Sequence, residues 1–476
     1  MGMTERVLSP GQHVHIVGIG GFGMSAIARV LLAQGYTVSG SDLHLNALTD
    51  ALAAAGAQIV RGHAPENIAG ADVVIATSAA TDDNPEIVAA RAAGVPVLRR
   101  REALGALLAS KIGVAVAGTH GKTTTSALAV EVLHAGDLSP SYIVGGVLRS
   151  TGTNAAVGHG QHFVIEADEY DRMFLGLSPH YAILTTIEHD HPDCFPTFDD
   201  VRAAFAEFVA RLPTEGLLVA CADDPTVRAL AAEREATGGA VVYYGLGEDL
   251  PKDAWRAGEI AARADGTHFY VWRGKRSIGY FHVTLHGQHN VANALGVLAL
   301  ADALGVSFER VRTALAHFAG TQRRAELLGR AAGVSVISDY AHHPTEIRVT
   351  LAAFRQRPDV RALWAVWQPH TYGRMRTLAD DFAGAFAAAD HVLVTDVYSV
   401  REQPAPGLDA PQMATRIAET GHPDARYSGD LEATARLLAE EVRAGDAVLI
   451  LSAGDAPRVG TLLLDALHQR EPSPDA

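Results

Sequence analysis

Residues 112–136, IGVAVAGTHGKTTTSALAVEVLHAG, decide the fold of this chain. An apolar run at residues 112–117 leads into a glycine turn, and a helical pattern starts at Lys122. A short apolar strand, a glycine turn and a helix form the building unit of a parallel α/β sheet. The segment therefore predicts a parallel sheet whose carboxyl-terminal edge carries this turn.

The turn has the residue types of a phosphate-binding loop. Its backbone N–H groups and the dipole of the following helix would attract a phosphate. Lys122 would reach the terminal phosphates, and Thr123 would place a hydroxyl on Mg²⁺. The usual pattern has glycine where Val116 stands, so the loop is a variant. An ordinary glycine turn is the alternative, and the Lys-Thr-Thr run directly after the turn argues against it.

Alternating strands and helices extend from this segment in both directions. Around Gly274, residues 266–284 instead resemble an antiparallel hairpin, and two helical stretches follow at residues 290–304 and 307–318. The other predicted strands lie within residues 13–18, 36–40, 72–79, 95–99, 162–171, 181–191, 216–224, 334–341, 362–368, 391–398 and 446–455.

Length and composition agree with a large globular protein. A chain of 476 residues fits about three domains of ~150 residues. The formal net charge of −15 argues against a nucleic-acid surface. Two cysteines, Cys194 and Cys221, make neither a disulfide framework nor a metal pattern, which favours a reducing cytoplasm. The sequence shows no signal peptide and no apolar run near the ~20 residues of a membrane helix, so membrane insertion is not expected.

A second glycine turn lies near the start, in HIVGIGGFGMSAIA at residues 15–28. Gly18, Gly20 and Gly23 have the G-x-G-x-x-G spacing of a dinucleotide-binding turn. Asp42 follows about 20 residues later, where an acidic residue would hold a ribose hydroxyl. Alone, this turn indicates either an NAD enzyme or a protein that holds another diphosphate.

Two polar clusters follow predicted strands of the central unit. VIEADEYD, residues 164–171, places four acids at a strand end, and Glu166 is the candidate to hold Mg²⁺. A solvated loop is the alternative for one or two of the other acids. TTIEHDHPD, residues 185–193, adds two histidines and three acids at the same sheet edge, which favours metal or phosphate binding.

Asn290 and Asn293 lie on one face at the start of a predicted helix and could read the edges of adenine. Helix N-capping is the alternative.

The third unit has two polar segments at strand ends, residues 338–347 and 367–376. In the second, Arg374 and Arg376 could bind carboxylate or phosphate, with surface solvation as the alternative for Arg376. Arg323 and Arg324 lie at the boundary between units, where domain closure could bring positive charge to a γ-phosphate.

The combination favours ATP chemistry on a substrate that carries its own diphosphate. A hydride-transfer enzyme needs no phosphate loop with Lys-Thr, and a simple ATPase needs no second diphosphate turn. An NAD dehydrogenase and a non-catalytic nucleotide-binding regulator remain as alternatives.

Eight motifs occur in the order found in the Mur ligases, and the chain resembles this family over nearly its whole length. The motifs are HIVGIGGFGMSAIA, SGSD, AGTHGKTTT, EADEYD, IEHDHPD, HNVANA, DYAHHPTEI and QPHTYGR. The resemblance implies an α/β fold of three domains. These are a Rossmann-like UDP-sugar domain (1–108), a central P-loop ATPase with a mostly parallel sheet and a small antiparallel hairpin (109–320), and a Rossmann-like domain closing over ATP and the amino acid (321–476).

The resemblance, strongest to the alanine-adding branch, implies an ATP-dependent carbon–nitrogen ligase of peptidoglycan synthesis in the cytoplasm. It would join L-alanine to the carboxylate of UDP-N-acetylmuramic acid through an acyl phosphate, with ATP as co-substrate and two Mg²⁺ ions. The partners are these small molecules, and the sequence is compatible with a homodimer. The closest rival is the recycling ligase that adds L-Ala-γ-D-Glu-meso-diaminopimelate to the same UDP-sugar.

Site residues follow by resemblance. The implied catalytic residues are Lys122, Glu166, His191, Arg374 and His343. The implied ATP-binding residues are Gly118, Thr119, His120, Gly121, Lys122, Thr123, Thr124, Asn290, Asn293, Arg324 and Asp339. The implied substrate-binding residues are Gly18, Gly20, Gly21, Gly23, Met24, Ser25, Asp42, Ser78, Tyr340, His342 and Arg374. The implied metal ligands are Thr123, Glu166 and His191.

Two positions depart from the family pattern. Many relatives have Asn where this chain has Thr186, and many have Arg where it has Thr371. The second departure removes one expected contact to the amino acid or sugar and leaves more of it to Arg374.

Overall fold

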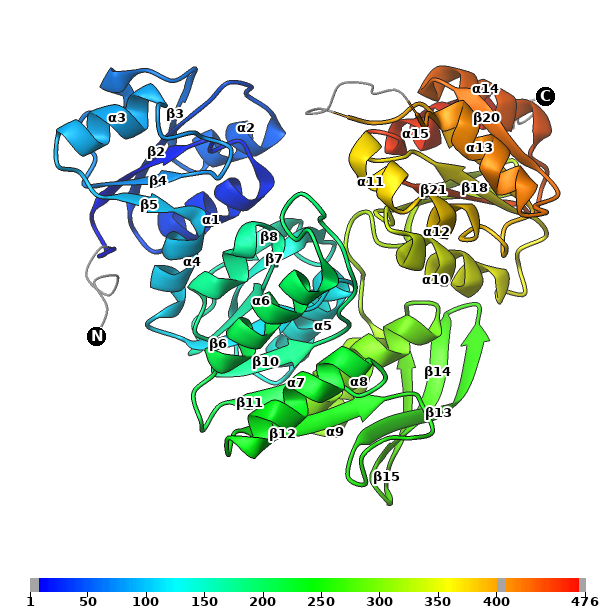
Figure 1. The fold of residues 1–476 in the computed structure, drawn as a ribbon, viewed down its shortest axis with the longest axis horizontal. Helices are drawn as coiled ribbons and strands as arrows, with labels where there is room; N and C mark the ends of the chain where they lie inside the picture. The colour runs from blue at the N-terminus through cyan, green and yellow to red at the C-terminus, as the bar shows by residue number, and fades with distance from the viewer. Residues whose placement is uncertain (1–7, 400–406, 471–476) are drawn as a thin grey trace, which may run out of the picture. The chain divides into compact units, whose positions relative to one another are not determined.

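The computed structural model describes residues 8–399 and 407–470, which form three β-sheets with flanking helices (Figure 1). The chain falls into two compact units. The first comprises Met1–Gly258, Val271–Gly279 and Ala292–Phe318, and the second comprises Glu259–Tyr270, Tyr280–Val291 and Ala319–Ala476. Among the described residues, no helix combines the length and apolar character needed to cross a membrane.

The N-terminal sheet has five parallel strands in the order β3-β2-β1-β4-β5. Its strands are β1 (His13–Val17), β2 (Thr37–Asp42), β3 (Gln58–Arg61), β4 (Val73–Ala76) and β5 (Val97–Arg99). Its helices are α1 (Phe22–Ala33), α2 (Ala47–Ala54), the 3-10 helix η2 (Pro65–Ile68), α3 (Pro85–Ala92) and α4 (Arg100–Leu108). The chain runs outward from β1 to β3 and then returns to β4, so a topological switch point lies between β1 and β4. Ligands of open α/β sheets bind at such a point.

The central sheet has ten strands in the order β15-β14-β13-β12-β11-β10-β6-β9-β7-β8. Its strands are β6 (Ile112–Ala117), β7 (Ser141–Leu148), β8 (Thr153–Ala156), β9 (His162–Glu166), β10 (Tyr181–Leu184), β11 (Leu217–Cys221), β12 (Ala240–Gly245), β13 (Trp255–Arg263), β14 (Gly266–Arg273) and β15 (Arg276–Val283). Its helices are α5 (Lys122–Ala135), the 3-10 helix η3 (Tyr170–Gly176), α6 (Phe198–Ala210), α7 (Pro225–Ala236), α8 (Gln288–Ala303) and α9 (Phe308–Ala316). Strand β6 pairs in parallel with both β9 and β10, so the ends of these three strands lie together at one sheet edge.

The C-terminal sheet has the order β16-β17-β21-β18-β19-β20, and only β16 runs antiparallel to its neighbour among the described strands. Its strands are β16 (Glu326–Ala331), β17 (Val334–Asp339), β18 (Leu363–Trp367), β19 (His391–Thr395), β20 (Ala425–Gly429) and β21 (Ala447–Leu451). Its helices are α10 (Pro344–Arg355), α11 (Tyr372–Thr377), α12 (Ala379–Ala383), α13 (Ala410–Glu419), α14 (Leu431–Glu441) and α15 (Pro457–His468).

Helices cover both faces of the C-terminal sheet. Leu363, Ala365 and Trp367 of β18 pack with α10 to α13, whereas the alternate residues Trp364 and Val366 pack with α14 and α15. A parallel sheet needs this double cover, because its strands are apolar on both sides.

The predicted fold class is confirmed: three α/β sheets with a small antiparallel addition to the central one. The hairpin expected around Gly274 corresponds to β14 and β15. Both cysteines are free thiols, as expected. Strands β3, β7, β8, β12, β13, β16 and β20 were not predicted. Several have sequences that do not favour a strand, such as TNAA in β8 and the alanine-rich β13, and sheet pairing outweighs local propensity there.

Candidate active site

The phosphate-type turn joins β6 to α5 and requires glycine at two positions. Gly121 is the N-cap of α5 with a φ of 78°, and a Cβ atom there would lie 2.7 Å from the side-chain oxygen of Asn293. Gly118 has a φ of 138°, and a Cβ atom there would overlap the hydroxyl of Thr185. Residues other than glycine rarely adopt such backbone angles, so the turn is built for close approach. The structure thus brings Asn293 of α8 against this turn.

Lys122 folds back over its own turn. Its Nζ donates to the carbonyl oxygens of Gly118 (2.6 Å) and Thr119 (3.0 Å) and lies 2.8 Å from Oε2 of Glu169. Burial lowers the pKa of Lys122, but the carboxylates of Glu169, Asp168 and Glu166 outweigh burial, so the pKa is raised and the ammonium stays charged. A fixed cation therefore lies at the mouth of the turn, where a phosphate would bind.

Glu169 is a buried partner that the sequence analysis did not single out. Its side chain is 3% exposed, and burial raises the pKa of its carboxyl to about 7, with Lys122 opposing and Asp168 reinforcing the shift. The alternative of a solvated loop, open for one or two of the acids besides Glu166, therefore does not describe Glu169. Its position three residues after Glu166, in a turn that leads into η3, was the only signal in the sequence.

Glu166 and Thr123 meet at the end of β9. The Thr123 hydroxyl donates to Oε1 of Glu166 (3.0 Å), and the N–H of Gly145 donates to Oε2 (2.6 Å). A hydroxyl and a carboxylate next to a phosphate-type turn are hard oxygen donors of the kind that Mg²⁺ prefers. These two residues therefore fit a magnesium ion.

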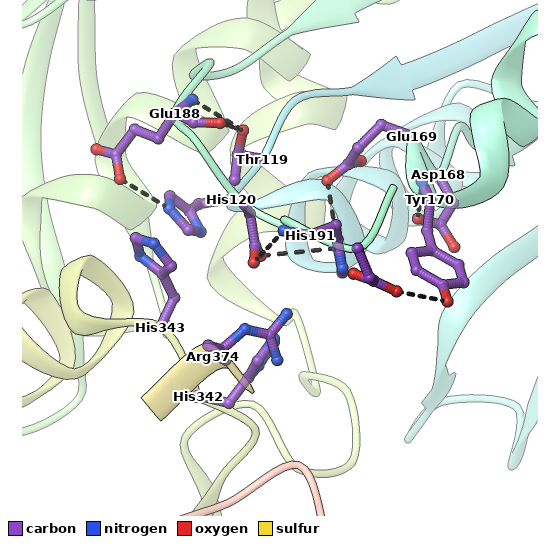
Figure 2. Close-up of polar contacts among 12 residues, drawn as sticks. Thr119, His120, Asp168, Glu169, Tyr170, Glu188, His191, His342, His343 and Arg374 are labelled. Atoms are coloured by element: carbon purple, nitrogen blue, oxygen red, sulfur yellow. Dashed lines mark hydrogen bonds and ion pairs between the residues drawn. The ribbon is translucent and has the colours of Figure 1, made fainter. Parts of the chain in front are cut away.

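His191 lies in the loop after β10 in a strained conformation, with a φ of 55°. Its Nε2 is 3.9 Å from Oε1 of Glu169 and 3.7 Å from Oδ2 of Asp190, and its ring lies 5.0 Å from that of Tyr170. Figure 2 shows His191 and Glu169 directed toward each other. Strain of this type persists only where surrounding contacts hold it, and it is frequent at functional sites.

The segment between β10 and His191 also forms hydrogen bonds with the phosphate-type turn. The backbone N–H of Glu188 donates to the Thr119 hydroxyl (2.9 Å), and the Glu188 carboxylate lies 3.1 Å from Nε2 of His120 (Figure 2). The N–H of Thr119 donates to the carbonyl of Thr186 (2.7 Å). Because position 186 acts here through its backbone, the turn keeps this contact although the side chain departs from the family pattern.

Arg100 is a second residue that the sequence analysis missed. Burial lowers the pKa of its guanidinium, while the acids Asp168, Glu166 and Asp171 oppose that shift. Its guanidinium also lies so close to Gly23 that a Cβ atom at Gly23 would overlap it. Arg100 therefore lies against the first turn of α1, within electrostatic reach of the acidic cluster after β9.

The N-terminal glycine turn is organised by the end of β2. The carbonyl of Ser41 accepts the N–H groups of Gly18 (2.8 Å) and Ile19 (3.1 Å), and the Asp42 carboxylate accepts the N–H of Gly20 (2.9 Å). Gly18 has a φ of 78°, and a Cβ atom there would lie 2.6 Å from the Thr77 side chain. The Asp42 carboxylate therefore holds the turn in shape.

The other assigned residues of this turn differ in exposure. Met24 is buried in the core, and the Ser25 hydroxyl donates to the carbonyl of Phe22 (2.9 Å). Ser78 is exposed directly after β4, at the switch point of the sheet.

In the second unit, Asp339 ends β17 and is buried. Its carboxylate accepts the N–H groups of Ala325 (2.7 Å) and Ala341 (2.8 Å). Burial raises the pKa of Asp339, and Arg324 and the two N–H groups oppose that shift. The guanidinium groups of Arg323 and Arg324 lie 5.0 and 5.1 Å from the centre of the Tyr340 ring. The structure thus gathers Arg324, Asp339 and Tyr340 at one strand end.

A second polar group of this unit surrounds the start of α10. Glu346 lies 3.3 Å from Nδ1 of His342 and 3.7 Å from the Arg324 guanidinium. His343 is the N-cap of α10, and its Nδ1 accepts the N–H of Thr345 (3.3 Å). His343 therefore caps helix α10, a structural role that its assignment as a catalytic residue did not include.

Arg374 and Arg376 have different environments on α11. Arg374 is buried, and its guanidinium lies 3.4 Å from Nδ1 of His370, whereas Arg376 is exposed. Thr371 caps α11 by accepting the N–H of Arg374 (3.4 Å) at a φ of 65°. Thr371 thus serves as a helix cap at the position where the family pattern leads us to expect arginine.

Asn290 and Asn293 are both buried on α8, three residues apart as expected. Asn290 also donates to the carbonyl of His286 (2.8 Å).

Three family models match the chain in succession: "Mur ligase family, catalytic domain" at residues 13–112, "Mur ligase middle domain" at 116–301 and "Mur ligase, glutamate ligase domain" at 323–454. The chain belongs to the Mur ligase family. It is 43% identical to the UDP-N-acetylmuramate–L-alanine ligase of Syntrophotalea carbinolica, over 96% of this chain and 98% of that protein.

Solved structures agree. A UDP-N-acetylmuramate-alanine ligase from Thermotoga maritima superposes with a TM-score of 0.80 at 29% identity, covering 97% of this chain and all of that one. A murein peptide ligase from Psychrobacter arcticus gives a TM-score of 0.68 at 27% identity over the same shares. The chain is thus similar to both branches, with the better superposition on the alanine ligase.

Proposed function

We propose that this chain is an ATP-dependent ligase that joins L-alanine to the carboxylate of UDP-N-acetylmuramic acid, in peptidoglycan synthesis. The observation that carries the proposal is the cluster of Lys122, Thr123 and Glu166 at the ends of β6 and β9. A second, separate glycine turn at the end of β1 supports it, because the reaction needs one site for ATP and one for the diphosphate of the sugar nucleotide.

The chemistry proceeds through an acyl phosphate. The carboxylate of the sugar attacks the γ-phosphorus of ATP, the bond to the bridging oxygen breaks, and ADP leaves. The alanine amine then attacks the acyl carbon, loses a proton and expels inorganic phosphate. Lys122 reduces the repulsion between carboxylate and triphosphate by holding a positive charge at the turn. In this role it exchanges Glu169 for phosphate oxygens.

Thr123 and Glu166 would hold one Mg²⁺, and His191 would hold a second. When bound, these ions neutralise phosphate charge and orient the triphosphate. Glu169 keeps His191 and Lys122 in place beside the turn, and Gly145 fixes the second oxygen of Glu166.

The N-terminal turn binds the diphosphate of the sugar nucleotide through the backbone N–H groups of the first turn of α1, around Gly23 and Met24, because the N–H groups of Gly20 and Gly21 already donate within the turn. Asp42 acts by shaping this turn, and Ser78 lies at the adjacent switch point.

The second unit supplies the remaining groups. Arg324 and Asp339 reach the nucleotide, and Tyr340, His342, His343 and Arg374 face the substrate carboxylate and the amino acid.

Asn290 and Asn293 of α8 bind the adenine. Domain closure excludes water, which would otherwise hydrolyse the acyl phosphate. The three proposed domains comprise residues 1–108, 109–320 and 321–476. The enzyme works in the cytoplasm, and its sequence is compatible with a homodimer.

A single assay tests the proposal against its nearest rival. We expect ADP release with UDP-N-acetylmuramic acid and L-alanine, and little with L-Ala-γ-D-Glu-meso-diaminopimelate. Turnover with the tripeptide alone would assign the chain to the recycling branch. Omission of each substrate in turn is the control, since repeated turnover of the ligase requires all three substrates.

A further inference from the structure

A carboxylate that takes no part in the proposed chemistry lies fully buried in the N-terminal sheet. Glu86, in the first turn of α3, is 0% exposed. It accepts hydrogen bonds from the hydroxyl of Ser41 (2.6 Å) and the amide of Asn67 (2.5 Å), and its Oε2 lies 3.1 Å from Nδ1 of His63. A buried charge is costly unless it is paired and hydrogen-bonded, so this group needs an explanation.

Histidines from two elements surround this carboxylate. His15 of β1 is buried, with Nε2 3.7 Å from Oε1 of Glu86, and its Nδ1 lies 2.8 Å from the hydroxyl of Ser39. His13 reaches the same hydroxyl with Nε2 at 2.7 Å. The titratable groups around Glu86 are therefore His15 and His63, with His13 one hydrogen bond further away. The network ties β1, β2 and the segment before η2 to the start of α3.

This network leads directly to the N-terminal glycine turn. Ser41, whose hydroxyl donates to Glu86, is the residue whose carbonyl accepts the N–H groups of Gly18 and Ile19. Its neighbour Asp42 accepts the N–H of Gly20. At the end of β2, the hydroxyl of Ser41 therefore contacts Glu86, and the backbone carbonyl of Ser41 contacts the glycine turn.

We infer that Glu86 is a positioning residue for the sugar-nucleotide site: through Ser41 it holds the end of β2, and with it the turn that binds the diphosphate. The same carboxylate also orients His63, which is 18% exposed beside it. This inference rests on the proposed function, because it takes the turn to be the site for the diphosphate of the UDP-sugar. Backbone N–H groups that are already ordered bind an anion without a further loss of conformational entropy. This advantage is lost when the contacts that order them are removed.

The test compares binding of two ligands to the full chain by calorimetry: UDP-N-acetylmuramic acid, and ADP with Mg²⁺. Glu86→Gln keeps the shape but removes the charge and places an amide N–H₂ against the donors of its neighbours. We expect about a tenfold loss of affinity for the sugar nucleotide and no change for ADP, because the ADP turn belongs to a different sheet. Glu66→Gln, on the exposed side of η2, is the matched control and should leave both affinities unchanged.

Ser41→Ala is the second variant, since it removes only the hydroxyl that contacts Glu86 and keeps the carbonyl that holds the turn. If both residues act through one route, the double variant binds the sugar nucleotide no more weakly than Glu86→Gln alone. Additive losses would overturn the inference, as would an unchanged affinity in both single variants. A parallel loss of ADP affinity in Ser41→Ala would overturn it too, because it indicates general destabilisation. Failure of the wild-type chain to bind the sugar nucleotide would instead refute the proposed function.

Discussion

The two glycine turns of this protein have the same strand–turn–helix construction but are supported in different ways. At the central turn, the cation Lys122 is bonded to two carbonyls of the turn and to the buried carboxylate of Glu169. At the N-terminal turn, the backbone is held by Ser41 and Asp42. The buried carboxylate of Glu86 accepts the hydroxyl of Ser41 and does not contact the turn itself.

The difference shows how one local motif can serve two ligands. A turn that holds a charged ammonium can stabilise charge that develops on a transferring phosphate. A turn that is held by a backbone carbonyl and a carboxylate, with no cation bonded to it, can bind a diphosphate that does not react. The side chains around each turn, more than its glycines, therefore distinguish the reacting site from the holding site.

The largest expected effect is at the central turn. Lys122→Ala should lower the rate of substrate-dependent ADP release by roughly 10³-fold, because it removes the charge that the phosphoryl transfer needs. Binding of UDP-N-acetylmuramic acid should persist, since that turn does not involve Lys122. The measurement is coupled ADP release together with calorimetry of the sugar nucleotide. Lys275→Ala, in the exposed hairpin turn, serves as the control, and equal losses of both properties would contradict the division of roles.

A smaller effect is expected from the buried charge behind the N-terminal turn. Burial raises the pKa of Glu86, but the nearby His15 and the hydrogen bonds from Ser41 and Asn67 outweigh burial and bring the pKa down from 4.5 to about 2. Since the folded pKa lies below the unfolded one, the stabilisation is present above about pH 4.5 and is lost as the pH falls toward 2.

Wild-type stability should therefore decrease between pH 7 and about pH 3 by about 2 kcal/mol more than that of Glu86→Gln. Urea unfolding at pH 7 and at about pH 3 measures the difference. An identical pH dependence in both proteins would show that the carboxylate gains nothing from its partners. Glu66→Gln is again the control.

The smallest effect tests the backbone of the N-terminal turn. Gly18→Ala must adopt a φ of 78° and meets the side chain of Thr77, so a loss of about 1–2 kcal/mol in stability is expected. Affinity for the sugar nucleotide should fall, while ADP binding should not. Gly94→Ala has a similar φ of 71° with open space around it, and should lose stability without losing affinity. If Gly18→Ala and Gly94→Ala both lost affinity for the sugar nucleotide, the geometry of the N-terminal turn would not be the reason for the loss.

Much of the architecture could be predicted from local sequence patterns. The runs that became β6, β9, β10 and β17 are short, apolar and followed by polar clusters, which is typical of buried parallel strands. The glycine turn before Lys122 and Thr123 likewise lies at the end of β6, as predicted, and its role as a phosphate site stays a prediction. Short or edge strands such as β8 and β20 carry little pattern of their own, because partner strands decide them.

Other features depended on which residues the fold brings together. Glu169 looked like one of several loop acids until the adjacency of β6 and β9 placed it on Lys122. Arg100 and Glu86 gave no motif at all, since their importance comes from burial beside residues distant in sequence. His343 was assigned from its motif, and its capping of α10 became visible only in the structure.

By itself, the sequence determined the class of fold, the two glycine turns and the acids at the strand ends, because these depend on local periodicity and on backbone angles that only glycine adopts readily. The tertiary structure decided which acid pairs with Lys122, which accepts the Thr123 hydroxyl and which accepts the Ser41 hydroxyl beside the N-terminal turn. The physical reason is that burial and charge pairing act over distances in space, and strand order, which local patterns do not specify, sets those distances.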